Sequence, residues 1–306
     1  MKKLSLSHRT ASHRAVFTLA FATLAPALPI AAAQNGEEFR VSAGVGYRAD
    51  ADIDHHRGDF NETRFGATVT RSFILDERWR IDPVVGYRFS AYDFSKSEPW
   101  DNVHQLRATV MMRHKVNEKW AVFGGPTAGL ALESGADVGD ALTFGGAIGV
   151  TYQVNERLAV GGGVGVTTQI EDNATVRPVL ILNWRINDRW TAESGYFEVA
   201  GGGGPGAEIR YQINDHWSVS GGMQYQENRF RLAEDQGPAR DGVGEDIFTP
   251  VYAKVTWQAS QHAAFELLGG IALGGELRLE NRNGHKLSDE DYDPAPLVGL
   301  RAVLTF

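Results

Sequence analysis

The sequence predicts an all-β fold, a transmembrane antiparallel up-and-down β-barrel of about fourteen strands, with about twelve as the alternative count. Three observations predict it. A short polar turn recurs along the chain, apolar and polar residues alternate between the turns, and the last segment alternates and closes on Phe306. Alternation with a period of two is typical of strands, because successive side chains point to opposite faces of a sheet.

The short turns share one pattern: an apolar residue, a polar turn that contains Asn or Asp, and then an aromatic residue or Leu. Asn and Asp tolerate the positive φ angles of tight turns, so the pattern predicts hairpins. Five clear copies and a weaker sixth are Ile74–Trp79, Val116–Trp120, Val154–Leu158, Ile186–Trp190, Ile213–Trp217 and Ala259–His262.

Longer and mostly acidic segments alternate with the short turns and are predicted to be loops at the opposite end of the strands. Short connections at one end and long connections at the other are typical of bacterial outer-membrane barrels. Because the number of strands is then even, both chain ends are expected on one side. The predicted loops are Asp50–Asp59, Ser95–Asn102, Ser134–Asp140, Glu171–Thr175, Ala200–Pro205, Ala233–Asp246 and Asn281–Asp293.

The two faces of the predicted strands differ in chemistry. In Leu142–Val154 one parity carries large apolar residues, and the other carries Gly, Ala, Thr and Gln. A soluble β-sandwich would place charges on the second face, so we expect the apolar face to contact lipid and the other face to line a lumen. Other strands carry charge on the inner parity. The predicted lumen-lining set is Arg64, Arg88, Arg107, Arg113, Arg177, Glu193, Glu208, Arg210, Glu266, Glu276 and Arg278.

Aromatic residues mark the ends of the predicted strands. Trp79, Trp120, Trp190 and Trp217 each follow a short turn directly, as expected for an aromatic girdle at the periplasmic interface of the bilayer. The alternating segment that ends in Phe306 resembles the C-terminal assembly signal of Gram-negative outer-membrane barrels. We therefore expect the barrel-assembly machinery to be a partner.

Residues 1–33 are predicted to be a cleaved signal peptide, and residues 34–306 the barrel domain. Four basic residues and no acidic residue accompany an apolar stretch, Ala15–Ala33, that ends in an Ala-x-Ala site. Pro26 and Pro29 disfavour the alternative, an uncleaved membrane anchor. Cleavage changes the formal net charge from −8 to −12, and so acidic a chain is not expected to bind nucleic acid.

Composition excludes several other classes of protein. The 306 residues include no Cys, which excludes a disulfide scaffold, a thiol nucleophile and a Cys-ligated metal. A mean hydropathy of −0.27 excludes a helical membrane protein. The 35 Gly residues follow no three-residue period, so the chain is not collagen-like.

The chain resembles a family of uncharacterised, Gly-rich outer-membrane β-barrels that is defined only as a domain of unknown function. The Asn-Glu/Asp-Arg-Trp turns, the segment Pro99–Asp101 and the segment Gly135–Gly146 carry this resemblance. It implies the barrel fold over most of the chain and supplies no activity.

Candidate catalytic side chains gather only at the predicted outer rim. Asp54, His55, His56 and His104 are residue types that a rim hydrolase would use, but no nucleophile motif accompanies them. The alternating carboxylates of Asp50–Asp54 lack the Gly and Glu of a calcium loop. We therefore assign no catalytic residue and expect no metal and no cofactor.

The inward Arg and Glu residues are the best functional candidates, because fixed charges along a lumen steer ions and small solutes. The sequence thus predicts a porin-like channel for passive passage of small hydrophilic solutes or ions. Two alternatives stay open: a closed barrel for structure or surface interaction, in which opposite charges pair across the lumen, and an outer-rim hydrolase. In each case we expect location in the outer membrane, with its lipid and lipopolysaccharide as partners.

Overall fold

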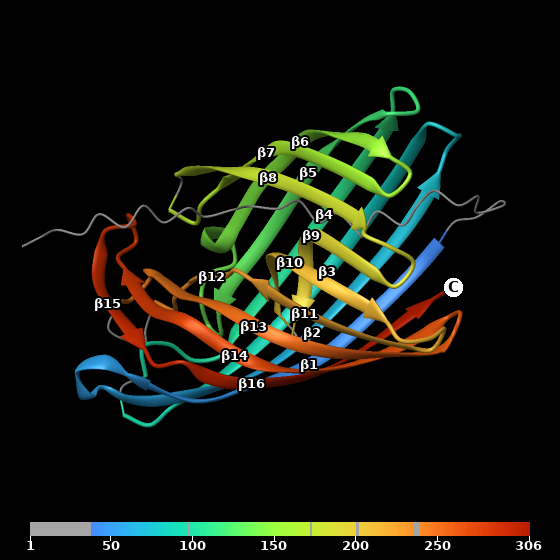
Figure 1. Cartoon of the computed structure of the whole chain (residues 1–306). Helices are drawn as coiled ribbons and strands as arrows, with labels where there is room; N and C mark the ends of the chain where they lie inside the picture. The colour runs from blue at the N-terminus through green and yellow to red at the C-terminus, as the bar shows by residue number, and fades with distance from the viewer. Residues whose placement is uncertain (1–37, 97, 172, 200–201, 235–238) are drawn as a thin grey trace, which may run out of the picture.

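The computed structural model describes residues 38–96, 98–171, 173–199, 202–234 and 239–306. The predicted signal peptide, residues 1–33, lies outside the described residues. The described chain forms a single antiparallel barrel wall that closes on itself (Figure 1). Its only described helices are two three-residue 3₁₀ turns, Asp54–His56 and Gly139–Ala141, and neither is long enough to cross a bilayer.

Sixteen strand segments form the fourteen strands of the barrel, because two barrel strands are interrupted. The segments are β1 (Glu38–Ile53), β2 (Gly58–Ile74), β3 (Trp79–Phe94), β4 (Val103–Lys115), β5 (Trp120–Glu133), β6 (Leu142–Asn155), β7 (Leu158–Thr168), β8 (Ala174–Arg185), β9 (Trp190–Val199), β10 (Gly202–Gln212), β11 (Trp217–Gln224), β12 (Gln226–Arg231), β13 (Val243–Ser260), β14 (Ala263–Glu280), β15 (Lys286–Tyr292) and β16 (Ala295–Thr305). β11 and β12 make one strand with a break at Tyr225, and β15 and β16 make another. The predicted fold class and the count of fourteen are confirmed.

The short turns are fixed by their own Asn or Asp side chains. Oδ1 of Asn117 accepts hydrogen bonds from the backbone N–H groups two and three residues later, both at 2.9 Å. Asp76, Asn187 and Asn214 accept the same pair of bonds in their own turns. Such a side chain replaces a strand partner for the turn backbone, which explains why the recurring motif forms hairpins.

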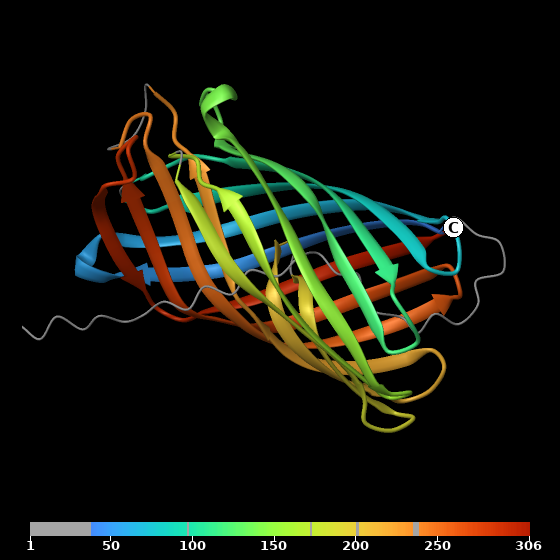
Figure 2. The same cartoon turned by 90° about the horizontal axis from the view of Figure 1, so that it is seen from above.

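Both described chain ends lie at the end of the barrel that carries these turns, which we call the short-turn end (Figure 2). Phe39 N–H donates to the Phe306 carbonyl at 3.1 Å, and Phe306 N–H donates to the Phe39 carbonyl at 2.8 Å. The two rings also touch, with centroids 6.1 Å apart. The β1–β16 ladder that closes the barrel therefore begins at the last residue of the chain. We call the opposite end the long-loop end.

The outer face of the barrel is apolar. In β6, Phe144, Ile148 and Val150 are exposed on one parity, while Gly and Ala occupy the other. Large exposed apolar side chains on this parity recur in strands all around the barrel. Such a surface needs an apolar phase around it, and closing the sheet on itself pairs most of its strand edges away from that phase.

One seam interrupts the wall. β7 and β8 pair over eleven residue pairs, whereas β8 and β9 pair over only four, which join Leu182–Arg185 to Thr191–Ser194. Along residues 174–181 no described strand pairs with β8 on the side of β9. We call this unpaired stretch the seam.

Beyond the seam, the half of the β9–β10 hairpin near its tip bends out of the wall and lies inside the barrel, between the sheet of β6–β8 and that of β13–β14 (Figure 1). The other half stays in the wall, where β9 pairs with β8 over Thr191–Ser194 and β10 pairs with β11 over Gly206–Gln212. The carbonyl of Gly203 accepts a hydrogen bond from Arg88 of β3 at 3.4 Å, and Glu198 accepts hydrogen bonds from Ser42 of β1 and Thr68 of β2. The predicted loop 200–205 is wrong in part, because Gly202–Pro205 pair with β9 as strand β10.

The lumen is filled at the long-loop end. Phe60, Phe94, Trp100, Phe230 and Phe248 belong to one buried apolar cluster there. β12 runs across to this cluster and touches β5 at a single parallel pair, Arg231 with Leu132. At the long-loop end, side chains from β1–β5 and β12–β15 therefore pack together and fill the lumen.

A buried ionic network completes the filling. Arg48 Nη2 lies 3.0 Å from Glu62 and 2.9 Å from Asp246, and all three side chains are buried. Tyr92 and Tyr292 also donate hydrogen bonds to Asp246, at 3.0 and 2.9 Å. The opposite charges compensate one another here, as buried charges require.

Candidate functional site

A cavity of about 340 Å³ remains inside the barrel beside this filling. Its wall comes from β1–β8 and β16, and its inner side comes from β9, β10 and β12. Many wall positions carry Gly or Thr, which leave the space open. These small lining residues include Gly66, Gly86, Gly129, Gly146 and Gly165, with Thr68, Thr109, Thr127, Thr143 and Thr167.

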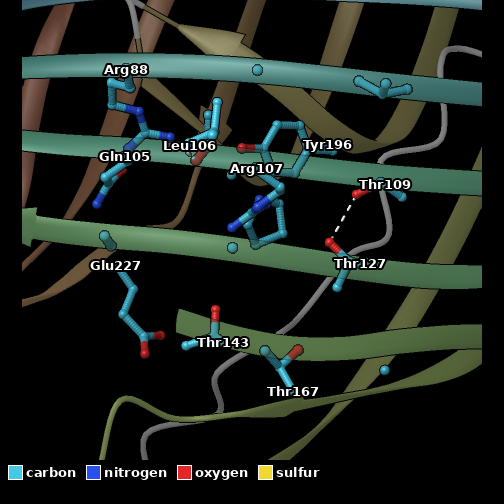
Figure 3. A pocket seen from close by; sticks show the side chains of 18 of the residues that line it. Arg88, Gln105, Leu106, Arg107, Thr109, Thr127, Thr143, Thr167, Tyr196 and Glu227 are labelled. Carbon is cyan, nitrogen blue, oxygen red and sulfur yellow. Dashed lines mark hydrogen bonds between the residues drawn. The ribbon is translucent and has the colours of Figure 1, made fainter. Parts of the chain in front are cut away.

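Arg107 stands in a row of small residues that crosses five strands. The register places it between Gly86 of β3 and Gly129 of β5, with Thr68 and Thr143 one strand further out on either side. Because glycine has no side chain, nothing encloses the guanidinium from the flanks. Arg107 is accordingly exposed, although it points into the barrel (Figure 3).

Arg88 lies diagonally from Arg107 across the β3–β4 pair. Arg88 is opposite Gln105, and Arg107 is opposite Gly86, so the two arginines occupy the same face two positions apart. Arg88 donates to Asn228 Oδ1 at 2.5 Å and to the carbonyl of Gly203 at 3.4 Å, and both partners are neutral. Within the described chain no carboxylate forms an ion pair with either arginine.

Other arginines of the cavity are neutralised. Arg177 lies 2.6 Å from Glu227, and Arg301 lies 2.6 Å from Glu198. Arg229 is likewise paired, at 2.8 Å, with Glu171 in the connection between β7 and β8. The uncompensated positive charge of the cavity therefore resides on Arg88 and Arg107.

Tyr196 of β9 meets this pair from the inner side. The Arg107 guanidinium carbon lies 5.8 Å from the centroid of the Tyr196 ring, within the range of a cation–π contact (Figure 3). Sequence reasoning did not select Tyr196. By parity with the predicted lumenal Glu193 it would face lipid, and only the inward fold of the hairpin brings it into the cavity.

The predicted lumen-lining residues separate into two groups. Arg88, Arg107 and Arg177 line the cavity. Arg64 is buried next to it, 2.5 Å from Glu62, and also donates to Gln226. The role of these residues in selectivity stays a prediction.

The remaining members of that set lie outside the cavity lining, and most are ion-paired. Glu208 is 2.9 Å from Lys254 and 3.3 Å from Arg210. Three further pairs are Arg210 with Glu193 at 3.8 Å, Arg301 with Glu266 at 3.3 Å and Arg278 with Glu276 at 2.6 Å. Arg113 belongs to neither the lining nor a described ion pair.

The candidate rim residues do not converge. His55 lies at the tip of the β1–β2 hairpin, and its Nδ1 is 3.1 Å from Glu290 of β15. His104 lies at the start of β4, with Nε2 3.2 Å from Ser134 Oγ and Nδ1 2.8 Å from the Tyr87 hydroxyl. The nitrogen that a catalytic carboxylate would orient is thus taken by a phenol. Among the described side chains, no group of three or more His, Asp or Glu could hold a metal.

A closed antiparallel barrel with an apolar exterior, sorted turns and a charged internal cavity defines the class of outer-membrane β-barrels. The chain belongs to the family described as "Domain of unknown function (DUF6268)", which matches residues 77–295. The resemblance seen in the sequence is confirmed. A comparison with curated proteins finds no match.

Several solved structures are similar over most of the chain. The COG4313 outer membrane channel from Pseudomonas putida F1 is 14% identical, with a TM-score of 0.46, and the match covers 89% of this chain and 97% of that chain. The toluene transporter TodX of P. putida is 11% identical, with a TM-score of 0.45 and coverage of 89% and 90%. A Pseudomonas aeruginosa FadL homologue is 12% identical, with a TM-score of 0.46 and coverage of 88% and 89%.

Proposed function

We propose that the protein is an outer-membrane channel for passive passage of small hydrophilic solutes or ions. One observation carries the proposal: a cavity inside the barrel rich in Gly and Thr, with two guanidinium groups that form no ion pair with any described carboxylate. A barrel that served only as a scaffold would gain nothing from open space, because unfilled volume forfeits packing contacts. Hydroxyl and guanidinium groups instead suit hydrated solutes.

The exterior supports a position in the outer membrane. Trp79, Trp120, Trp190 and Trp217 are each between 40% and 45% exposed and follow the short turns. Indole rings prefer the bilayer interface, which places these turns at one surface of the membrane. Outer-membrane barrels have short turns on the periplasmic side, so in this proposal the short-turn end faces the periplasm and the long-loop end faces outward. The long-loop end then meets lipopolysaccharide, and Phe306 lies where the assembly machinery would read it.

Solutes pass beside the filled part of the lumen in this proposal. The cluster around Phe60 and the network around Asp246 block the direct axis at the long-loop end. The cavity between the β1–β8 and β16 wall and the β9–β10 hairpin offers internal space beside this blockage. Arg88 and Arg107 impose a positive field on it, which favours anions.

Single-channel conductance of the refolded mature chain, residues 34–306, in a planar bilayer tests the proposal. Folding is checked first by heat-dependent gel mobility. Steady openings whose conductance scales with salt are expected, and a folded barrel that stays silent would contradict the proposal.

Reversal potentials in a KCl gradient test the charge assignment. The wild-type channel is expected to prefer chloride, and R88Q/R107Q to lose that preference. R157Q is the control, because Arg157 lies in a short turn outside the lumen and only loosely approaches Asp188, at 3.6 Å. Equal shifts in the double variant and the control would contradict the assignment.

The seam supports a second candidate function, lateral passage of apolar molecules between the cavity and the bilayer. Unpaired backbone groups of a strand edge are costly in lipid, so a seam at membrane depth needs a reason. A fluorophore on Thr175→Cys, which lines the cavity at the seam, reports lipid access through quenching by brominated lipids. Outward Val176→Cys and cavity-lining Thr143→Cys on β6 are the positive and negative controls. Absence of quenching at Thr175→Cys would exclude this function.

A further inference from the structure

We infer that Arg88 and Arg107 form a binding site for small hydroxylated organic carboxylates in the cavity. The inference deepens the proposed channel function, because it names the class of solute that the cavity selects. Four features carry it: the pairing of the two arginines, the engagement of every nearby carboxylate, the free polar groups around them, and the size of the space.

Two arginines on one face repel each other unless an anion lies between them. Arg88 and Arg107 are diagonal neighbours on the inner face of β3 and β4, and their guanidinium groups point into the same cavity (Figure 3). Holding like charges together without a counter-charge costs free energy. An anion supplied from outside the chain would remove that cost, and the planar fork of arginine matches a carboxylate.

No carboxylate of the cavity is free to act as that counter-ion. Glu198 is held by Arg301 at 2.6 Å, Thr68 at 2.5 Å and Ser42 at 2.9 Å. Glu227 is held by Arg177 at 2.6 Å. These two are the acidic residues among the described cavity lining, so no described carboxylate is left to compensate the two arginines, and we assign that role to a ligand.

Neutral hydrogen-bonding groups line the same cavity wall as the arginine pair. Gln105 lies opposite Arg88, and Thr143 lies at the end of the Arg107 row. Thr167 lies on the next strand of the wall, β7. The side chains of Gln105, Thr143 and Thr167 make no hydrogen bond to any described residue. Free amide and hydroxyl groups beside a carboxylate site suit a ligand that carries hydroxyl groups of its own.

The space around Arg107 accommodates a ligand larger than an inorganic ion. Gly86 and Gly129 flank the arginine, and the cavity volume is about 340 Å³. A bare chloride or phosphate would contact the guanidinium groups and leave the free amide and hydroxyl groups unused. A hydroxylated carboxylate reaches both.

Calorimetric titration of the folded mature chain in detergent with D-gluconate tests the site. D-glucose is the matched neutral ligand, since it offers the hydroxyl groups without the carboxylate, and inorganic phosphate is the matched inorganic anion. We expect gluconate to bind, with glucose and phosphate binding at least about tenfold more weakly. R107Q and R88Q should each weaken gluconate binding by about tenfold or more, and R107K should be intermediate because it keeps the charge and loses the fork.

R157Q is the control for net charge and should keep the wild-type affinity. Heat-dependent gel mobility verifies the fold of each variant. Wild-type affinity in R107Q, or equal affinities for gluconate and glucose, would overturn the site, and phosphate binding as tightly as gluconate would overturn the ligand class. Because titration does not depend on conduction, a silent barrel that binds gluconate would contradict the channel and keep the site, and a conducting barrel that binds none would do the reverse.

Discussion

The guanidinium of Arg107 and the ring of Tyr196 face each other across the cavity, with 5.8 Å between the guanidinium carbon and the ring centroid. Arg107 belongs to the barrel wall and Tyr196 to the hairpin that has left it. The distance between these two groups therefore depends on the position of the hairpin, and so does the width of the cavity between them.

The β9–β10 hairpin is packed too closely to accept a larger residue at Gly204. A Cβ added there would lie 2.1 Å from the carbonyl oxygen of Tyr225, whereas one added at Gly269 of β14 would meet nothing within 4 Å. Backbone cannot yield as a flexible side chain does, so G204A is expected to lower the free energy of unfolding by about 1–3 kcal/mol. Urea unfolding in lipid vesicles measures the effect.

G269A is the matched control, with the same added methyl group on a barrel strand. We expect its unfolding midpoint to stay near that of the wild-type protein. Equal midpoints for G204A and G269A would show that the hairpin does not pack against Tyr225.

The turn at Asp76 predicts a pH dependence of stability. Hydrogen bonds from the backbone N–H groups of Arg78 and Trp79 lower the pKa of Asp76 below its ordinary value of 3.8. A lowered pKa in the folded state stabilises the protein above the unfolded pKa, and this contribution is lost as the pH falls through the folded pKa. Below about pH 3.8 the wild-type protein should therefore lose stability that D76N does not lose.

D76N is expected to keep the turn, because Asn occupies the same position in the turns at Asn117, Asn187 and Asn214. D76A removes the acceptor and should unfold at lower urea concentration at every pH. Identical pH profiles for wild type and D76N would refute the role of the Asp76 carboxylate.

The buried network at the long-loop end should be the most sensitive ionic site of the barrel. D246N leaves the buried Arg48 with Glu62 as its remaining carboxylate partner. Breaking a buried ion pair is expected to lower the free energy of unfolding by about 3–5 kcal/mol. D188N is the control, because Asp188 is exposed and lies 3.6 Å from Arg157. Similar losses in D246N and D188N would mean that water reaches the network.

Cysteine pairs measure the seam directly, since the chain has no Cys of its own. Asn183 and Glu193 are partners in the short β8–β9 ladder, so N183C/E193C should form a disulfide under mild oxidation. Four residues further along each strand, in the same register, V179C/F197C spans the seam and should stay reduced. Rapid oxidation of V179C/F197C in membranes would show that β8 and β9 pair along their whole length there.

The sequence allowed the strands and turns to be predicted because these depend on local chemistry. Asn117 sets its turn through its own side chain, and the alternation around Ile148 sets which face meets lipid. Charge on the inner parity predicted Arg88, Arg107 and Arg177 as lumen-lining residues, and these three are among the residues that line the cavity. Most of the other predicted lumen-lining residues are in ion pairs. Parity alone does not reveal which charged side chain lacks an oppositely charged partner.

By itself, then, the sequence determined a fourteen-strand barrel with an apolar exterior and sorted connections, since period-two patterning and turn chemistry act over a few residues. Only the tertiary structure decided that the tip of the β9–β10 hairpin lies inside, that Tyr196 faces Arg107 rather than lipid, and that Arg88 and Arg107 form no ion pair with a described carboxylate. These features depend on contacts between strands distant in the chain. A strand that leaves the wall keeps its local pattern, while both of its faces become internal.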